Sequence, residues 1–194
     1  MKKIITTLLF CSSALFCMAQ QTEITELLTK ITKPYIENTD FSFKFSAQIS
    51  SNNIEGTIKV SGDKYRIDTN DFTMIFDGKD RYNYVKKNNE VYIETLVIDG
   101  KEIDIMQSPQ RLLKLTKNST PTLSTNSKGN RELFFEKEGL KVSIDSSDNI
   151  SSINVINNKS TIYILDSDTN IKFSESTFIF DKEDYKGVEI IDFR

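Results

Sequence analysis

The sequence predicts a mainly β protein of the α+β class, with about eleven antiparallel strands and only two helices. Short runs of alternating apolar and polar residues recur along the chain, and turn residues separate them. The 194 residues include 13 Phe and 7 Tyr but only 7 Gly and 3 Pro, which favours an aromatic β core over disorder. This length is typical of a single domain.

The first 19 residues have the pattern of a cleaved signal peptide. A basic start at Lys2 and Lys3 precedes an apolar segment from Ile4 to Phe16, and Ala19 supplies the small residue expected before the cleavage site. The apolar segment is too short to span a membrane comfortably. We therefore expect export to the periplasm, with residues 20–194 forming the mature domain.

Both cysteines, Cys11 and Cys17, lie in the signal segment, and each follows a Phe. A lipid-modified cysteine usually follows a small residue, which argues against lipidation. The mature chain would have no cysteine and hence no disulfide. Because Lys2 and Lys3 leave with the signal, 23 of 25 basic residues remain against 28 acidic ones, and the net charge moves from −3 to −5. Such a chain has no general attraction to nucleic acid.

The sequence contains no His, which removes the commonest general base and the commonest transition-metal ligand. Four carboxylates bracket one expected strand and could suggest a metal or hydrolase site, namely Asp68, Asp71, Asp77 and Asp80. Aspartate is also a favoured turn residue, and we prefer that interpretation. We expect neither catalysis, nor a metal, nor a cofactor.

The mature chain begins with an expected helix over Thr22–Pro34, where Ile24, Leu27, Leu28 and Ile31 make an apolar stripe at helical spacing. Pro34 is expected to end it. A strand over Phe41–Ile49 follows, with strict alternation of apolar and polar residues.

A five-stranded meander is expected next. Each run alternates with a period of two, so its apolar residues share one face. The runs are Ile54–Val60, Tyr65–Asp68, Phe72–Phe76, Arg81–Val85 and Glu90–Leu96.

Beyond Leu96 we expect a hairpin around Asp99-Gly100 and a short helix from Ser108 to Leu115, with Ser108 and Pro109 at favoured starting positions. Residues 117–128 form a loop or an irregular edge. A second meander and two closing strands are then expected at Glu132–Glu136, Leu140–Ile144, Ile150–Ile156, Thr161–Leu165, Asn170–Phe173, Ser176–Phe180 and Val188–Phe193.

Two short helices cannot cover the apolar face of about eleven strands, since a three-turn helix covers three or four strands. An incompletely covered sheet is a natural site for an apolar ligand, although an ordinary core is the simpler interpretation. The expected inner face comprises Phe41, Phe43, Phe45, Ile58, Val60, Met74, Phe76, Tyr82, Tyr84, Val91 and Ile93.

The chain resembles the LolA-like periplasmic carriers of outer-membrane lipoproteins. The resemblance rests on the order of several short motifs along the mature chain. They are the N-terminal helix, FSFKFSAQI from Phe41, GTIKV from Gly56, GDKYR from Gly62, FDGK from Phe76, YNY from Tyr82, the Ser108 helix, and the tail with FIF from Phe178 and KGVEIID from Lys186.

The resemblance implies an unclosed antiparallel β-barrel with a helical lid, whose apolar cavity shields the acyl chains of lipoproteins. Acylated lipoproteins, an inner-membrane lipoprotein-releasing transporter and an outer-membrane acceptor would be the partners of a monomeric carrier. The cavity residues would be the inner face given above together with Met106, Leu112, Leu113 and Leu115.

Carriers of this kind place an Arg just after the strand that matches Gly56–Val60, where it ties the lid shut. That place here reads Ser61-Gly62-Asp63, with Arg66 nearby. An alternative is therefore a periplasmic lipid-binding or sensor domain that binds a lipid or an envelope protein without delivering cargo. A carboxylate hydrolase is a third hypothesis, which would need two carboxylates in one polar pocket.

Overall fold

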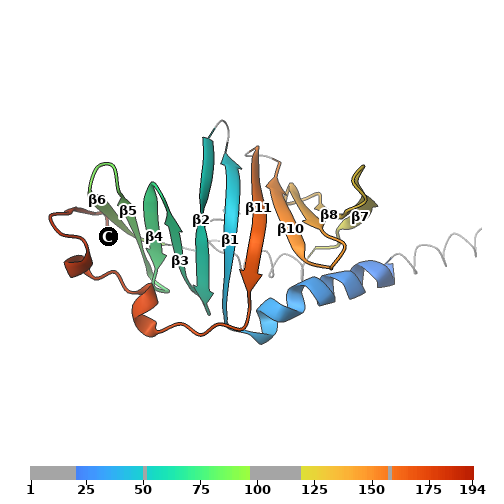
Figure 1. Cartoon of the computed structure of the whole chain (residues 1–194), viewed down its shortest axis with the longest axis horizontal. Coiled ribbons are helices and arrows are strands. Elements are labelled where there is room, and N and C mark those ends of the chain that lie inside the picture. Colours follow the sequence, from blue (N-terminus) through green and yellow to red (C-terminus); the bar gives the residue numbers. More distant parts are fainter. Residues whose placement is uncertain (1–20, 50–51, 97–118, 157–158) are drawn as a thin grey trace, which may run out of the picture.

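The computed structural model describes residues 21–49, 52–96, 119–156 and 159–194. Within these residues the protein is one twelve-stranded sheet with a helix at its N-terminal end (Figure 1). The mainly β fold with an N-terminal helix is confirmed. The strands are β1 (Asp40–Ile49), β2 (Asn52–Ser61), β3 (Lys64–Thr69), β4 (Phe72–Phe76), β5 (Asp80–Val85), β6 (Glu90–Thr95), β7 (Thr122–Thr125), β8 (Arg131–Phe135), β9 (Leu140–Ile144), β10 (Ile150–Val155), β11 (Ser160–Asp168) and β12 (Glu189–Asp192).

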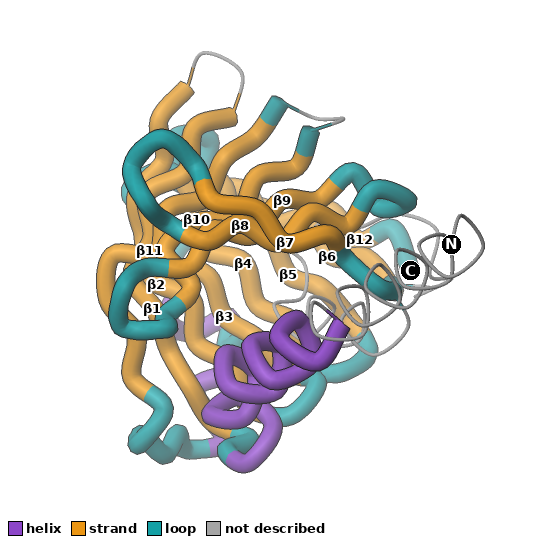
Figure 2. Tube along the Cα trace, turned by 90° about the vertical axis from the view of Figure 1, so that its right-hand side faces the viewer, coloured by secondary structure: helices purple, strands orange, loops and turns teal. Residues whose placement is uncertain are grey.

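The sheet consists of two meanders that meet at β1. Its order is β12-β6-β5-β4-β3-β2-β1-β11-β10-β9-β8-β7, so β12 and β7 are its two edges and the barrel is not closed. Neighbouring strands pair antiparallel, except that β12 pairs parallel with β6. Figure 2 shows the strands as an arc with the helix lying across its open side.

The helix covers residues 21–37 of the described chain and continues one turn past Pro34. The expectation that Pro34 ends it is therefore wrong. A proline breaks a helix by removing one backbone donor, and this loss is tolerable so close to the end. Asn38 then caps the helix, because its backbone N–H and its Nδ2 both donate to the Pro34 carbonyl, at 3.3 and 3.0 Å.

One hydrophobic core lies between the helix and the face of the sheet that it covers, here called the inner face. Ile24, Leu27 and Ile31 from the helix are buried together with apolar side chains of both meanders. Tyr35 packs edge-on against Phe41, with ring centroids 5.0 Å apart. Burial of these side chains is what holds the helix on the sheet.

The C-terminal strap, residues 169–194, crosses the opposite face of the first meander, here called the outer face. It contains two short 3-10 helices, η1 (Glu175–Phe178) and η2 (Lys182–Asp184), before β12. The predicted strands Asn170–Phe173 and Ser176–Phe180 are therefore wrong. The chain does not turn at 166–169 either, because β11 extends to Asp168.

Candidate functional site

The structure gathers most of the predicted inner-face residues of β1 to β4 in the core. Phe41, Phe43 and Phe45 project from the same side of β1, and Phe41 and Phe43 stack at 6.4 Å. Ile58 and Val60 lie opposite Phe43 and Phe41 on β2. These five side chains and Phe76 are buried, while Met74 is partly buried and packs against them. The aromatic inner face is thus a filled core in the described residues.

Tyr82, Tyr84, Val91 and Ile93 are not part of that face, and the prediction that they share it is wrong. On β4 and β5, Met74 pairs with Asn83 and Phe76 with Arg81, which puts Tyr82 and Tyr84 on the outer side. On β6, Val91 pairs with Tyr84 and Ile93 pairs with Tyr82, so both lie on the outer side as well. Register decides the face, because a shift of one residue reverses every side chain of a strand.

These four residues form a second apolar layer beneath the C-terminal strap. Tyr82 stacks on Phe180 at 5.2 Å, and Tyr84 meets Tyr185 edge-on at 4.7 Å. Val91 and Ile93 are buried, as is Phe178 from the strap. Aromatic contacts of this kind add to the burial of apolar area. The first meander is therefore covered on its outer face by its own chain.

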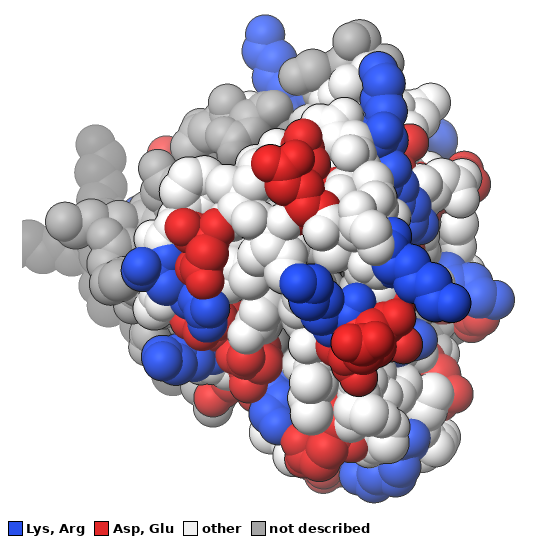
Figure 3. All heavy atoms as spheres, turned by 90° about the vertical axis from the view of Figure 1, so that its left-hand side faces the viewer, with Lys and Arg blue, Asp and Glu red and all other residues white. Residues whose placement is uncertain are grey.

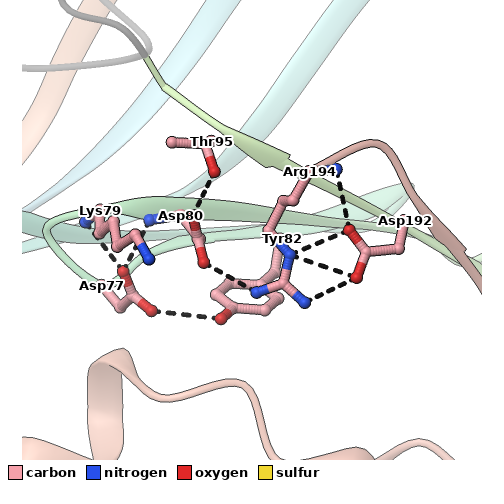
Figure 4. Close-up of polar contacts among 7 residues, drawn as sticks. All are labelled: Asp77, Lys79, Asp80, Tyr82, Thr95, Asp192 and Arg194. Carbon is pink, nitrogen blue, oxygen red and sulfur yellow. Dashed lines mark hydrogen bonds and ion pairs between the residues drawn. The ribbon is translucent and has the colours of Figure 1, made fainter.

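A polar network fastens the end of the strap (Figure 4). Arg194 donates from Nη1 to Asp80 Oδ2 at 2.8 Å and from Nη2 to Asp192 Oδ2 at 2.6 Å. Thr95 donates to the other oxygen of Asp80 at 2.7 Å. The hydrogen bonds from Thr95 and Arg194 hold the pKa of Asp80 below its usual value. Asp80 is thus an anchor for the end of the strap.

Asp77 is a turn residue, as expected. Its Oδ1 accepts hydrogen bonds from the backbone N–H groups of Lys79 and Asp80, at 2.9 and 2.8 Å, and its Oδ2 accepts one from the Tyr82 hydroxyl at 3.2 Å.

Figure 3 shows the face of the molecule at this end, where acidic and basic side chains are interspersed. No group of three or more residues that could hold a metal ion occurs in the part of the chain that the structure describes.

A groove of about 650 Å³ lies beside the N-terminal helix, between one side of that helix and residues 119–121, which lead into β7. The helix residues on it extend from Gln21 to Glu37, a length of about 24 Å at 1.5 Å per residue. Its lining comprises Gln21, Ile24, Thr25, Leu28, Thr29, Thr32, Lys33, Ile36, Glu37, Ser119, Thr120 and Pro121. None of the predicted cavity residues is among them.

The lining of the groove is more apolar than its residue types indicate. Thr25, Thr29 and Thr32 each donate the hydroxyl hydrogen to a carbonyl four residues earlier in the helix, at 2.7 to 2.9 Å. Because these donors are used within the helix, the threonines offer mainly their methyl groups to a ligand. Ile24 and Leu28 contribute to both the groove and the core.

A charged pair lies at one end of the groove, and a second set of ion pairs ties the helix to the sheet away from the groove lining. Lys33 and Glu37 form an exposed ion pair at 3.7 Å, one helical turn apart. Lys30, on the same helix, pairs with Asp148 in the turn between β9 and β10, and Arg131 of β8 pairs with the same carboxylate. The groove therefore joins an apolar length to a charge-balanced end.

Sequence reasoning missed this groove because the helix was judged by its buried stripe alone. A signal was present, since threonines at 25, 29 and 32 recur at helical spacing beside the stripe. Met106, Leu112, Leu113 and Leu115, together with the predicted hairpin and lid helix, lie outside the described residues. Among the described helices, none is long and apolar enough to cross a membrane.

Comparison with known proteins finds similarity only at the level of structure. No protein-family model matches the chain, and no curated protein matches it significantly. An uncharacterized conserved protein from Thermus thermophilus superposes with a TM-score of 0.55 at 11% identity, over 87% of this chain and 98% of that one. At this identity the likeness concerns the fold alone.

Two further solved structures superpose less closely. A DUF1329 family protein from Desulfovibrio piger ATCC 29098 has a TM-score of 0.40 at 10% identity, over 86% of this chain and 99% of that chain. A chain from the Pseudomonas aeruginosa MucA/MucB complex has a TM-score of 0.39 at 12% identity, over 83% of this chain and 62% of that chain. The comparisons show no family for the chain, and only the likeness to the Thermus thermophilus protein bears on its fold.

Proposed function

We propose that this protein is a non-enzymatic periplasmic carrier that shields acyl chains, with lipoproteins as its cargo. The groove beside the N-terminal helix carries the proposal. It extends along the helix from Gln21 to Glu37, it is lined by Ile24, Leu28, Ile36 and Pro121 together with threonine methyl groups, and its volume lies within the usual range of ligand sites. A linear apolar chain suits this length and lining better than a compact polar ligand.

The energetics suit such a ligand. Each methylene moved from water into an apolar site contributes about 0.8 kcal/mol, so even a partly buried acyl chain binds appreciably. Ile24 and Leu28 connect the groove to the aromatic core, so a small outward movement of the helix would extend the apolar surface toward Phe43 and Phe45. The signal-peptide pattern expected for the first 19 residues and the resemblance to the motif order of the LolA-like carriers support a role between the two membranes.

The first test is ligand binding by the mature chain, residues 20–194. The purified protein is extracted with solvent for mass spectrometry and titrated with 11-(dansylamino)undecanoic acid, whose fluorescence rises in an apolar site. Ile36 lines the groove and is 52% exposed, so Ile36→Asp should fold normally yet weaken the probe about fivefold or more, because it puts a charge where the chain packs.

Ile179→Asp is the matched control. Ile179 is 56% exposed on the C-terminal strap and does not line the groove, so this variant should bind the probe as the wild type does. Equal weakening by both variants would mean that the probe binds exposed apolar surface in general. Absence of bound lipid and of probe binding would remove the proposal.

A lipid-binding or sensor domain that delivers no cargo remains the second candidate. The observation in its favour is that Phe41, Phe43 and Phe45 are already buried in the core of the described residues and do not line the groove. Depletion of the protein in its own organism separates the two functions. Loss of a carrier strands lipoproteins in the inner membrane, whereas loss of a sensor leaves their location unchanged.

A further inference from the structure

The two edges of the sheet differ in charge. β12 carries Glu189 and Asp192 within its four residues, whereas the four residues of β7 read TLST and carry no charge. Charged side chains on an edge strand discourage its pairing with another chain. Of the two edges of the described sheet, β7 is therefore the one that is open to a further strand.

The hairpin between β7 and β8 fixes which backbone groups of β7 face outward. The Asn126 N–H donates to the Asn130 carbonyl at 2.9 Å, and bonded pairs recur at every second residue of an antiparallel ladder. Ser124 therefore bonds to β8, and its neighbours Leu123 and Thr125 do not. The N–H and C=O groups of Leu123 and Thr125 point away from β8, where no strand of the described sheet pairs with them.

The edge of β7 continues directly from the groove. Residues 119–121 line the groove, and the next residue begins the strand. Pro121 lies two residues before Leu123 but has no N–H, so a ladder along this edge ends there. Leu123 packs against the core on the inner face, so an added strand would place every second side chain on that face as well. A ligand that leaves the groove at Pro121 thus reaches the outward backbone groups of β7.

We propose that the edge of β7 binds the first residues of an acylated polypeptide as an additional strand, while the acyl chain of that polypeptide lies in the groove. This inference rests on the proposed function of the groove. An acyl chain on the first residue places this residue near Pro121 and the following ones along Leu123 and Thr125. The added strand therefore runs parallel to β7, with apolar side chains beside Leu123 and polar ones on the outer face.

The other edge of the sheet shows the hydrogen bonds of such a parallel pair. Glu189 of β12 pairs with Glu90, but its N–H donates to the carbonyl of Asn89, one residue earlier, at 3.0 Å. In a peptide that alternates valine and threonine, with valine opposite Leu123 and Thr125, the threonine backbone groups would therefore bond to β7. In an antiparallel peptide the valine backbone groups would do so, because directly opposed residues exchange the bonds.

The test uses an N-dodecanoyl hexapeptide amide of alternating valine and threonine, titrated into the mature chain by isothermal titration calorimetry. Two further hexapeptides carry backbone N-methyl groups on all threonines or on the internal valines. N-dodecanoylvaline amide has the acyl chain without the strand. The unmodified and the valine-methylated hexapeptides should bind about tenfold more tightly than this amide, since several backbone hydrogen bonds add to the acyl contact. The threonine-methylated hexapeptide should bind no more tightly than the amide.

A variant of the edge tests the same contact from the protein. Thr125→Pro removes one outward N–H and leaves the bonds to β8, so it should weaken the unmodified hexapeptide about threefold or more and leave N-dodecanoylvaline amide unaffected. Ser124→Ala is the matched control and should bind both ligands as the wild type does. Thermal unfolding checks that each variant folds. Amide hydrogen exchange at Leu123 and Thr125 of the wild type should be fast in the free protein and slow in the complex.

Equal binding of the three hexapeptides would overturn the inference. Weakening by valine methylation alone would also overturn it, because an antiparallel peptide has its acylated end away from the groove. Slow exchange at Leu123 and Thr125 in the free protein would mean that the edge is already paired, and a dimer that Thr125→Pro dissociates would assign the edge to a second copy of the chain; either result overturns the inference.

The two proposals fail in different ways. Binding of N-dodecanoylvaline amide with no gain from the hexapeptide would remove this inference and leave the acyl groove in place. Absence of binding by the amide and by every hexapeptide would remove the proposed function, and the inference with it.

Discussion

Gly56 is the position where one added methyl group should disturb the fold most. It lies inside β2, opposite Phe45 of β1 and Thr69 of β3. A Cβ built on it would lie 2.3 Å from the backbone oxygen of Asp68, about 1.1 Å short of ordinary contact, and 3.1 Å from Cε1 of the Phe45 ring. The oxygen belongs to the β3 backbone and cannot rotate away. Gly56→Ala must therefore push β2 and β3 apart.

We expect Gly56→Ala to lower the free energy of unfolding by about 3 kcal/mol or more, the upper end of the range for overpacked cores. For a domain of this size the thermal midpoint would then fall by about 6–12 °C. Urea unfolding followed by far-UV circular dichroism measures the change directly. Gly62→Ala is the matched control, since Gly62 has φ of 58° and nothing within 4 Å of its added Cβ. It should cost only about 1 kcal/mol, from backbone strain.

A Gly56→Ala variant within about 0.5 kcal/mol of the wild type would refute the reasoning, because that is the scale of neutral surface substitutions. The double variant with Phe45→Leu separates the two contacts. Removing part of the ring relieves the 3.1 Å contact but not the contact with the Asp68 oxygen. Rescue of stability by Phe45→Leu would therefore show that the ring, and not the backbone, sets the requirement for glycine.

Three further predictions concern charge, face and ligand. Burial alone would raise the pKa of Asp40, but hydrogen bonds from the Phe173 N–H, Ser61 and Thr39 lower it below its usual value. The charged form of Asp40 therefore adds stability above about pH 4, and this contribution is lost as the pH falls through the folded pKa. In urea titrations the difference in stability between the wild type and Asp40→Asn should shrink toward about pH 2. A difference that stays constant with pH would contradict this. Phe178→Ala should lower the free energy of unfolding by about 3–5 kcal/mol, since Phe178 of the strap is buried against the outer face. It should leave the affinity for the probe unchanged in the folded protein. A loss of affinity would mean that the probe binds at the outer face instead of in the groove. Glu37→Gln removes a negative charge at one end of the groove, so it should strengthen binding of the anionic probe 11-(dansylamino)undecanoic acid about two- to fivefold at low salt but leave binding of its methyl ester unchanged. Glu26→Gln is the control. An equal effect on both ligands would argue against a charge contact at this end of the groove.

The sequence shows which side chains share a face within one strand. Which faces of neighbouring strands match depends also on the pairing register between those strands. Phe41, Phe43 and Phe45 share a face because side chains alternate along β1 whatever its neighbours are. Four residues connect Phe76 to its partner Arg81 on the next strand, and an even number reverses the parity of the inward positions. Even positions on β4 must then give odd ones on β5. The prediction that Tyr82 and Tyr84 face inward uses only the alternation within their own strand and leaves out this relation between strands.

The strap and the groove depend on contacts that a local pattern does not contain. Residues 170–180 have enough apolar and β-branched residues to favour a strand. In the structure Phe178 is instead buried against the outer face, and the backbone forms a short 3-10 helix there. The groove needs residues 119–121 to approach a helix about 90 positions earlier in the chain. Tertiary packing of this kind overrides local propensity.

The pairing of β1 with β11 has a kinetic consequence. The other antiparallel pairs in the described sheet join strands that follow one another along the chain, whereas the β1 and β11 partners are 111 to 126 positions apart. Each meander can therefore zip up from its own hairpins, but joining the two requires closure of one long loop, and non-local pairing of that kind slows folding. Substitutions at the β1–β11 seam, such as Ala47→Gly, should slow refolding, while equal destabilisation within a hairpin of either meander should mainly speed unfolding.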